Sequence, residues 1–173
     1  TRNQARKRGG RVSGSELVGL IPLETMISAG KYYLNEQKRS TGIPTKDIIH
    51  IAVKSMGLDD LSPFNPKEKI IEYRIGRRFG VLASMRLHEF SDELSLESAA
   101  PGGGSVSAVA GLLGASLSSM VANLTLGKKK WLTSFDQMSK ISQKSQQLKD
   151  ELIKLIDADT DAFKSVMEAY SMP

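Results

Sequence analysis

The chain of 173 residues contains no cysteine and only two histidines, His50 and His88. Without cysteine it can form neither a disulfide bond nor a thiolate-ligated metal site. No acidic cluster accompanies either histidine in the sequence, so we expect no protein-bound metal ion. The lack of disulfide bonds suits a reducing compartment, and no signal peptide is visible. We therefore expect a cytoplasmic protein.

Aromatic residues make up only 6% of the chain, and none is interleaved with its basic clusters. The net charge is +5, and basic residues concentrate in two places: Arg2, Arg6, Lys7, Arg8 and Arg11, and then Lys128, Lys129 and Lys130. Aromatic side chains are the usual stacking surface for bases, so we expect no nucleic-acid partner. The first cluster precedes Gly9 and Gly10 and is typical of a helix C-terminus. The lysine cluster suits an anionic small molecule.

Charged residues are absent from residues 98–127, a run long enough to cross a bilayer of about 30 Å as a helix. The polar content of this run argues against a membrane span. It contains Pro101, three glycines at its start, and Ser105, Ser107, Ser116, Ser118, Ser119, Asn123 and Thr125. We therefore expect the central, fully buried helix of a bundle and no membrane partner.

The first part of the chain combines one expected strand with helices. Residues 12–21 favour a strand that ends before a proline. Helical spacing predicts helices over about residues 23–38, and from Thr45 as N-cap to a stop at Gly57. Asn65, followed by proline and three residues later by glutamate, is a strong helix start.

The second part of the chain is helical throughout. Residues 76–84 contain glycines and arginines and are interpreted as a linker, with Ser84 as the cap of the next helix. Long helices are predicted over about residues 104–126 and 133–167, which is typical of a helix bundle. The sequence thus predicts a mostly α protein with three parts: residues 1–75, the linker 76–84, and residues 85–173.

Asp159 stands in an otherwise apolar stripe of the last predicted helix. The stripe steps by three or four residues except for one gap of eight, which Asp159 fills: Leu148, Leu152, Leu155, Phe163, Val166 and Tyr170. A buried carboxylate is costly unless it is neutral or paired, and burial favours its protonated form. Such acids gather at functional sites, so Asp159 is a candidate functional residue. The alternative is a structural acid paired with an arginine or with a backbone donor of another helix.

A glycine-rich loop opens the long uncharged helix, and it comprises Pro101, Gly102, Gly103, Gly104 and Ser105. Glycines let the backbone approach a ligand, and free N–H groups at a helix start attract anions. The loop lacks the Gly-Lys-Ser/Thr ending of a P-loop and the preceding strand of a dinucleotide site. It is either an anion-binding loop or a plain flexible turn.

Small residues recur along one face of the same helix: Gly104, Ala108, Gly111, Ala115, Ser118 and Ala122. Small side chains allow another helix to come close. The stripe therefore predicts close helix packing, either within the chain or across an interface between subunits.

Several motifs, in this order, resemble the formiminotransferase-cyclodeaminase family and cover nearly the whole chain. Residues 13–22 (SGSELVGLIP), 57–61 (GLDDL) and 63–73 (PFNPKEKIIEY) resemble the end of its transferase half. Residues 98–106 (SAAPGGGSV) and 155–159 (LIDAD) with Ala162 and Phe163 are similar to the start of its cyclodeaminase half. The first residue is Thr1 and the last is Pro173, which fits a piece of a longer protein.

The resemblance implies a fold and a reaction. It implies a ferredoxin-like α+β remnant of one strand plus helices, followed by an all-α bundle. The parent enzyme would move a formimino group from N-formimino-glutamate to tetrahydrofolate. It would then close 5-formiminotetrahydrofolate to 5,10-methenyltetrahydrofolate with release of ammonia. In the family the second aspartate of the Asp-Ala-Asp triplet is catalytic, and here it is Asp159.

The remaining expectations concern partners and alternatives. We expect a homo-oligomer, and a polyglutamylated folate tail near two groups of residues: Gly102, Gly103, Gly104 and Ser105, and Lys128, Lys129 and Lys130. The family's transferase histidine matches neither His50 nor His88, so we expect no transferase activity from this chain alone. Two alternatives stay open: an enzyme similar to methenyltetrahydrofolate cyclohydrolases, and a non-catalytic segment for assembly or substrate hand-over.

Overall fold

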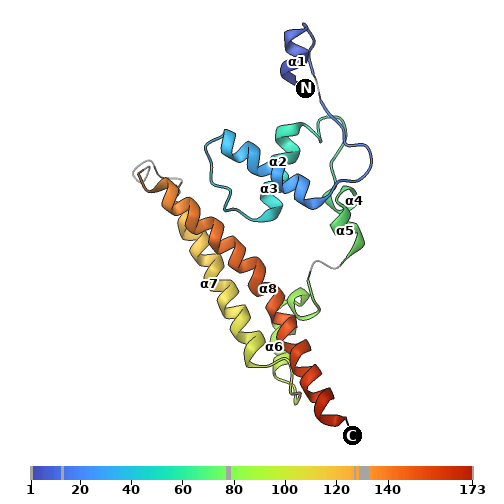
Figure 1. The fold of residues 1–173 in the computed structure, drawn as a ribbon, viewed down its shortest axis with the longest axis vertical. Coiled ribbons are helices and arrows are strands. Elements are labelled where there is room, and N and C mark those ends of the chain that lie inside the picture. Colours follow the sequence, from blue (N-terminus) through green and yellow to red (C-terminus); the bar gives the residue numbers. More distant parts are fainter. Residues whose placement is uncertain (1, 13, 77–78, 127, 129–132, 173) are drawn as a thin grey trace. The chain divides into compact units, whose positions relative to one another are not determined.

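The computed structural model describes residues 2–12, 14–76, 79–126, 128 and 133–172. Within these residues the chain forms helices and no strand (Figure 1), so the expected mostly α class is confirmed. The helices are α1 (Arg2–Lys7), α2 (Leu23–Glu36), α3 (Thr45–Met56), α4 (Pro66–Lys69), α5 (Ile71–Ile75), the 3-10 helix η1 (Leu82–Ser84), α6 (Leu87–Leu94), α7 (Gly103–Leu126) and α8 (Phe135–Ser171). They divide into two compact units, Thr1–Gly76 and Arg77–Pro173.

The first unit is built around the pair α2 and α3. Its buried cluster comprises Met26, Ile49, Ala52, Val53 and Ile70. The two helices approach closely at Gly30, where a Cβ atom would overlap the backbone carbonyl of Ile48. A glycine at this position therefore permits the contact that closes the core.

The strand predicted over residues 12–21 is wrong for the part that the structure describes. Only Ile21 pairs, in an isolated parallel bridge with Ile70. Its N–H donates to the Lys69 carbonyl at 2.9 Å, and its carbonyl accepts from Ile71 at 3.0 Å. Val18 is 89% exposed. A strand needs a neighbour for each ladder hydrogen bond. Besides the bridge at Ile21, only the N–H of Ser15 has a backbone partner among the described residues of this segment, the Gly57 carbonyl at 3.2 Å, and the two contacts do not form a ladder. The expected ferredoxin-like sheet remnant is not formed there.

Local signals placed most helix ends well. Asn65 caps α4 as predicted, because its side chain accepts a hydrogen bond from Lys67 N–H at 3.1 Å. Gly57 ends α3 with a positive φ of 70°. The predicted cap at Thr45 is wrong by one position, since Pro44 precedes the helix. The predicted cap at Ser84 is also wrong: α6 starts at Leu87, after Arg86 donates its N–H to Glu89.

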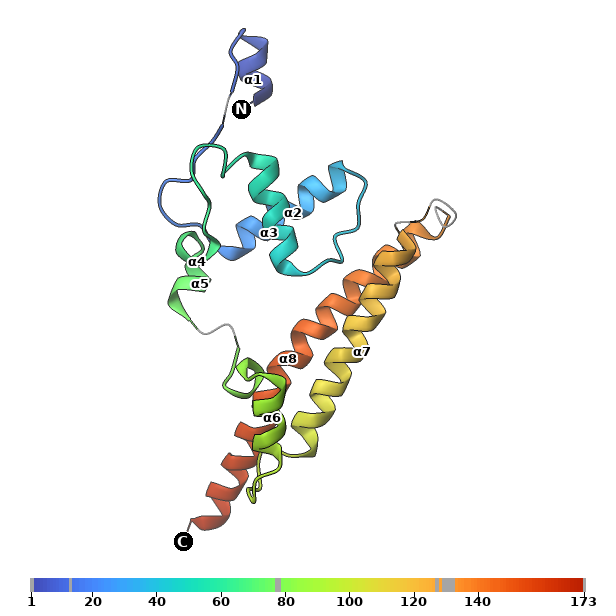
Figure 2. The same ribbon diagram turned by 180° about the vertical axis from the view of Figure 1, so that it is seen from behind.

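In the second unit, α7 and α8 run antiparallel and side by side (Figures 1 and 2). Their contact faces carry mostly small and hydroxyl side chains. The buried residues of α7 are Ser105, Ala108, Ser119 and Ala122, and those of α8 are Ser142, Ser145, Ile156 and Thr160. Gly111 lets the side chain of Leu152 reach α7. The predicted small-residue stripe thus packs within the chain, through Ala108, Gly111 and Ala122.

The large apolar residues of α7 face outward: Leu113, Leu117, Met120, Val121 and Leu124 are all at least half exposed. Only 22% of the most apolar window of α7 is buried, so the expected fully buried helix is wrong for this chain. By length and composition α7 is able to cross a membrane.

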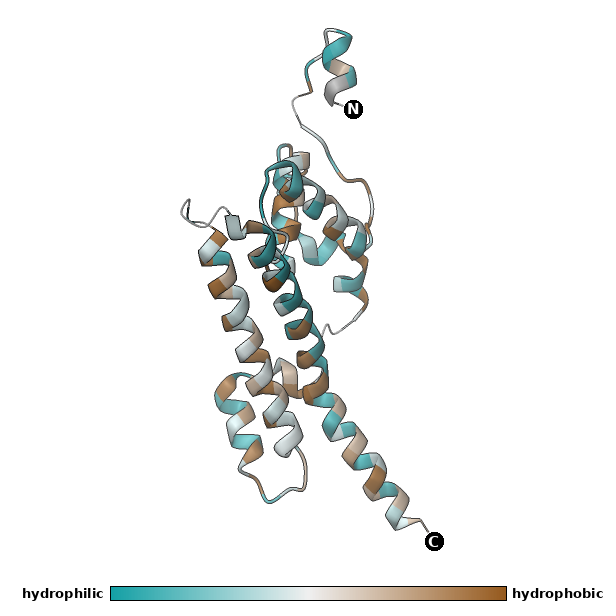
Figure 3. Cartoon of the chain, turned by 60° about the vertical axis from the view of Figure 1, so that its left-hand side comes forward, coloured by the Kyte–Doolittle hydropathy of each residue, from teal (hydrophilic) through white to brown (hydrophobic). Residues whose placement is uncertain are grey.

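The pairing of α7 with α8 argues against that placement. The N-terminal half of α8 is strongly hydrophilic (Figure 3) and carries Lys140, Lys144, Lys149, Asp150, Glu151 and Lys154. A bilayer around α7 would enclose these charges, which is costly.

We expect Gly30→Ala to destabilise the first unit by about 1–3 kcal/mol, as overpacking does. The added Cβ would overlap the Ile48 carbonyl, a backbone group that no rotamer change moves aside. This effect exceeds the gain of about 1 kcal/mol that alanine brings to a helix. Urea unfolding followed by circular dichroism measures it. Gly114→Ala in α7 is the control, because its Cβ would meet nothing within 4 Å. Equal stability of both variants would contradict the close approach.

Candidate functional site

Asp159 of α8 lies against the N-terminus of α7. The backbone N–H of Ser105 donates to its Oδ2 at 3.0 Å. The helix dipole places its positive end toward this carboxylate, which is the favourable orientation. A Cβ atom on Gly104 would overlap the carboxylate, so the contact requires glycine there. The glycine-rich loop and Asp159, 54 residues apart, therefore form one site.

The hydroxyl of Ser105 also hydrogen-bonds to the turn of α8 that carries Asp159. It donates to the Ile156 carbonyl at 2.7 Å and lies 3.3 Å from the Thr160 hydroxyl and 3.4 Å from Asp159 Oδ2. Ser105 is fully buried and Thr160 is buried. These contacts surround Asp159 on its own helix turn, so they hold the backbone that carries the carboxylate.

The expected burial of Asp159 is wrong in this chain. Asp159 is exposed, and its stripe neighbours Leu155 and Phe163 are 52% and 39% exposed. The stripe lies at the edge of the contact between α7 and α8: Leu152 packs at Gly111 and Asp159 binds Ser105, whereas the buried residues of α8 are mostly hydroxyl ones beside the stripe. Asp159 has a backbone donor from another helix, which was the alternative left open by the sequence.

A hollow of about 510 Å³ lies beside this carboxylate. We call it the Asp159 hollow, and it is lined by Gly104, Ser107, Ala108, Leu152, Leu155, Ala158 and Asp159. Its wall is mainly apolar, with the carboxylate and the Ser107 hydroxyl as polar groups. Such a surface suits a flat, partly apolar molecule held next to one acid.

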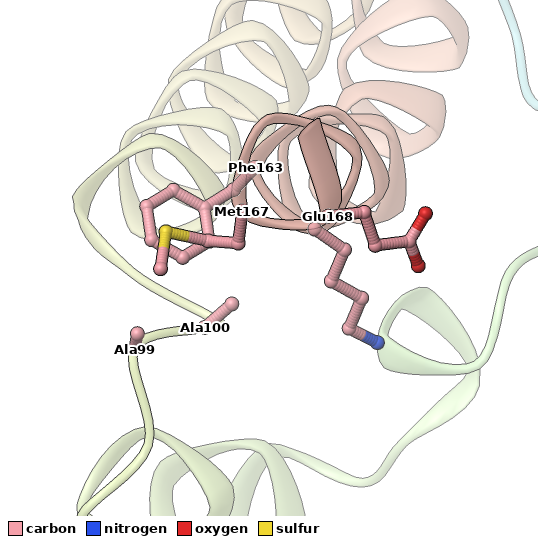
Figure 4. A pocket seen from close by; sticks show the side chains of 6 residues that line it. Ala99, Ala100, Phe163, Met167 and Glu168 are labelled. Carbon is pink, nitrogen blue, oxygen red and sulfur yellow. The ribbon is translucent and has the colours of Figure 1, made fainter. Parts of the chain in front are cut away.

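A second hollow, of about 360 Å³, begins one helical turn further along α8. We call it the Phe163 hollow, and it is lined by Ala99, Ala100, Phe163, Lys164, Met167 and Glu168. Figure 4 shows Phe163 and Met167 on the side of α8 that faces Ala99 and Ala100, with Glu168 on the other side. Asp159 thus lines the first hollow and lies one helical turn before the second hollow along α8.

The residues that were expected to contact folate do not lie together in the structure. Gly103 and Gly104 form the first turn of α7, and the Gly102 carbonyl accepts from Val106 N–H at 3.1 Å. The N–H of Ser105 already binds Asp159, so this group is not open to an external anion. Lys128 is exposed beyond the far end of α7, about 36 Å away at 1.5 Å per residue. Lys129 and Lys130 lie outside the described residues.

A second carboxylate of the same turn was missed in the sequence. It is Asp157, whose Oδ1 accepts from Leu82 N–H at 2.8 Å and whose Oδ2 accepts from Ala83 N–H at 3.0 Å. No local signal reveals this contact, because the partners lie more than 70 residues away. Among the described residues no group of three or more potential metal ligands is found.

Comparison with known families gives two matches in succession. A formiminotransferase domain matches residues 1–76, and the formiminotransferase-cyclodeaminase model matches residues 86–173. The chain belongs to the formiminotransferase-cyclodeaminase family. The resemblance drawn from the sequence motifs is confirmed. Between the two family matches lie residues 77–85, which overlap the linker expected at 76–84.

Relatives of known name cover the chain but extend well beyond it. Formimidoyltransferase-cyclodeaminase of Gallus gallus is 40% identical over 164 residues, which are 94% of this chain and 30% of the relative. The Mus musculus protein of the same name is 37% identical over 99% of this chain and 32% of its own length. Methenyltetrahydrofolate cyclohydrolase of Methylorubrum extorquens is 40% identical over 87 residues, half of this chain and 42% of that protein. The chain therefore spans about a third of the formimidoyltransferase-cyclodeaminases it matches.

We expect Gly104→Ala to separate Asp159 from the N-terminus of α7. The new Cβ would occupy the position of the carboxylate, so the hydrogen bond to Ser105 N–H would break. Amide hydrogen exchange at Ser105 should rise about tenfold or more, in line with the loss of one charge-assisted hydrogen bond. Gly103→Ala is the control, since its Cβ would meet nothing within 4 Å. Unchanged exchange at Ser105 in Gly104→Ala would show that the contact does not need glycine.

Proposed function

We propose that this chain is part of a bifunctional folate enzyme. Residues 1–75 would be the end of its formiminotransferase domain, 76–84 the linker and 85–173 the N-terminal part of its cyclodeaminase domain. The whole enzyme would transfer the formimino group of N-formimino-glutamate to tetrahydrofolate. It would then convert 5-formiminotetrahydrofolate to 5,10-methenyltetrahydrofolate and ammonia. The order of the two family matches supports this assignment.

One observation carries the chemical part of the proposal: a hydrogen-bonded carboxylate, Asp159, borders a largely apolar hollow. In the ring closure N10 attacks the carbon of the protonated formimino group, an amidinium (C=NH2+), and a tetrahedral aminal that carries an NH2 group forms. N10 must lose a proton, and the nitrogen that departs as ammonia must gain one. A carboxylate beside both nitrogens can accept the first proton and return it to the leaving group. Acid–base catalysis of this kind contributes about 10²–10⁴-fold.

The two hollows support a placement of the substrate. In folate the reacting N5 and N10 lie between the pteridine ring and the aminobenzoyl ring. Asp159 lines the first hollow, and the second hollow begins at Phe163, one helical turn further along α8. We place the pteridine in the Asp159 hollow and the aminobenzoyl ring against Phe163 and Met167. The glutamate tail would continue past Lys164. Lys128 would then reach only the distal residues of a long polyglutamate.

A further part of the proposal rests on the outward apolar faces of α7 and α8. Such faces need cover from other protein, so we propose a homo-oligomer. A cytoplasmic location agrees with the lack of cysteine, and we propose no metal cofactor, since the proton transfers need none.

The cyclohydrolase-like reaction is the second candidate, because the Methylorubrum extorquens cyclohydrolase matches half of the chain. Asp159 would then activate water for attack on a methenyl carbon. The transferase match over residues 1–76 favours cyclodeamination. The products separate the two reactions, since only cyclodeamination releases ammonia.

We expect Asp159→Asn in the full-length enzyme to reduce ammonia release by about 10²–10⁴-fold, because an amide cannot carry the proton between the two nitrogens. Formimino transfer should stay unchanged. Both rates are measured on the same preparation, the first by ammonia production and the second by consumption of N-formimino-glutamate. Asp161→Asn, an exposed acid two residues further along α8, is the control. Near-normal ammonia release in Asp159→Asn would reject the catalytic role.

We expect Met167→Ala to raise the KM for cyclodeamination several-fold with little change in kcat, because it removes part of the surface placed under the aminobenzoyl ring. Val166→Ala is a matched control: Val166 is 51% exposed and Met167 50%, but only Met167 lines the Phe163 hollow. Steady-state kinetics of the full-length variants measures the difference. Equal KM values for the two variants would remove the aminobenzoyl ring from this hollow.

A further inference from the structure

Two acids of one helical turn, Asp157 and Asp159, reach two different segments of the second unit. Asp159 binds the N-terminus of α7 through Ser105 N–H. Asp157 binds the segment before α6 through two backbone N–H groups. In each case a glycine stands where a Cβ would overlap the carboxylate, Gly104 for Asp159 and Gly80 for Asp157. The same arrangement, an acid of α8 that accepts from backbone N–H groups next to a glycine, therefore occurs twice.

The segment around Gly80 is shaped to hold a carboxylate. Leu82 N–H and Ala83 N–H point to separate oxygens of Asp157, at 2.8 and 3.0 Å. The turn is closed by Ser84, whose hydroxyl donates to the Gly80 carbonyl at 2.7 Å. A carboxylate can accept these two hydrogen bonds because it has two acceptor oxygens. A neutral amide cannot, because it has only one acceptor atom.

The segment that Asp157 binds also packs against the turn of α8 that carries Asp159, the proposed catalytic acid. Leu82 belongs to a buried cluster with Phe90, Ala108 and Ile156. Ile156 is also the residue whose carbonyl accepts the hydrogen bond from the Ser105 hydroxyl. One turn of α8 thus binds the segment of η1 on one side and the start of α7 on the other.

We infer that Asp157 is a positioning residue for Asp159. By tying the segment 80–83 to α8, it sets the rotation of the turn that presents Asp159 to Ser105 and to the Asp159 hollow. Ala158 and Asp159 line that hollow, whereas Asp157 faces η1, so Asp157 acts without touching the substrate. This inference rests on the proposed cyclodeaminase function for its kinetic consequence, and on the hydrogen bonds alone for its structural one.

The kinetic test uses the full-length enzyme with Asp157→Ala, Asp157→Asn and Gly80→Ala. We expect Asp157→Ala to lower kcat for ammonia release by about 10–100-fold with an unchanged KM, as a small misplacement of a catalytic group does. Asp157→Asn should be intermediate, since it keeps one acceptor. Gly80→Ala should behave like Asp157→Ala, because its Cβ would displace the carboxylate without altering the charge. Asp161→Ala should keep the normal kcat.

A double-mutant cycle separates positioning from general stability. If Asp157 acts through Asp159, adding Asp157→Ala to Asp159→Asn should cause no further loss of kcat. An undiminished additional loss would overturn the inference, and so would a lowered melting temperature of Asp157→Ala with a normal kcat.

Amide exchange gives a readout that is independent of activity. In Asp157→Ala and Asp157→Asn, exchange at Ser105 should accelerate, because Asp159 moves away from its N–H. Unchanged exchange at Ser105 in both variants would overturn the inference even if Asp159 proves catalytic. If Asp159→Asn instead keeps its activity, the proposed function fails, and accelerated exchange at Ser105 would still support the positioning role.

Discussion

The close contact between α7 and α8 is the constraint on which the second unit depends. The two helices meet through hydroxyl and small side chains, so their backbones come near enough for a short acid of one helix to bind the first turn of the other. Gly104 makes this possible for Asp159, since any side chain there would occupy the place of the carboxylate. Ser105 completes the contact with its N–H and its hydroxyl. The residues that pack α7 against α8 therefore also hold the candidate catalytic acid in place.

The same constraint explains where the large apolar residues are. Because small residues occupy the α7–α8 contact, leucines and methionines are left on the outer faces. This gives α7 the composition of a membrane helix, although its partner α8 is strongly charged along the shared length. Faces of this kind are typical of helices that sit in the middle of a larger assembly.

The state of the candidate acid follows from its position as well. The spacing of the α8 stripe predicted a desolvated, protonated Asp159, whereas the structure presents an exposed carboxylate with a backbone donor. In the proposed ring closure one nitrogen loses a proton and its neighbour gains one. The proposed ring closure needs both steps on neighbouring nitrogens, so a fixed carboxylate beside an apolar hollow suits it.

The sequence alone determined those features that depend on nearby residues or on family likeness. The cap at Asn65, the stop at Gly57 and the extents of the two long helices are local, because they rest on backbone preferences and hydrogen bonds within one or two turns. The spacing also singled out Asp159, and the motifs identified the family. Only the tertiary structure decided which face of α8 is buried, that Ser105 serves Asp159, and that Asp157 binds η1. These contacts join residues more than 50 positions apart, and helical periodicity shows that a face exists without showing what covers it.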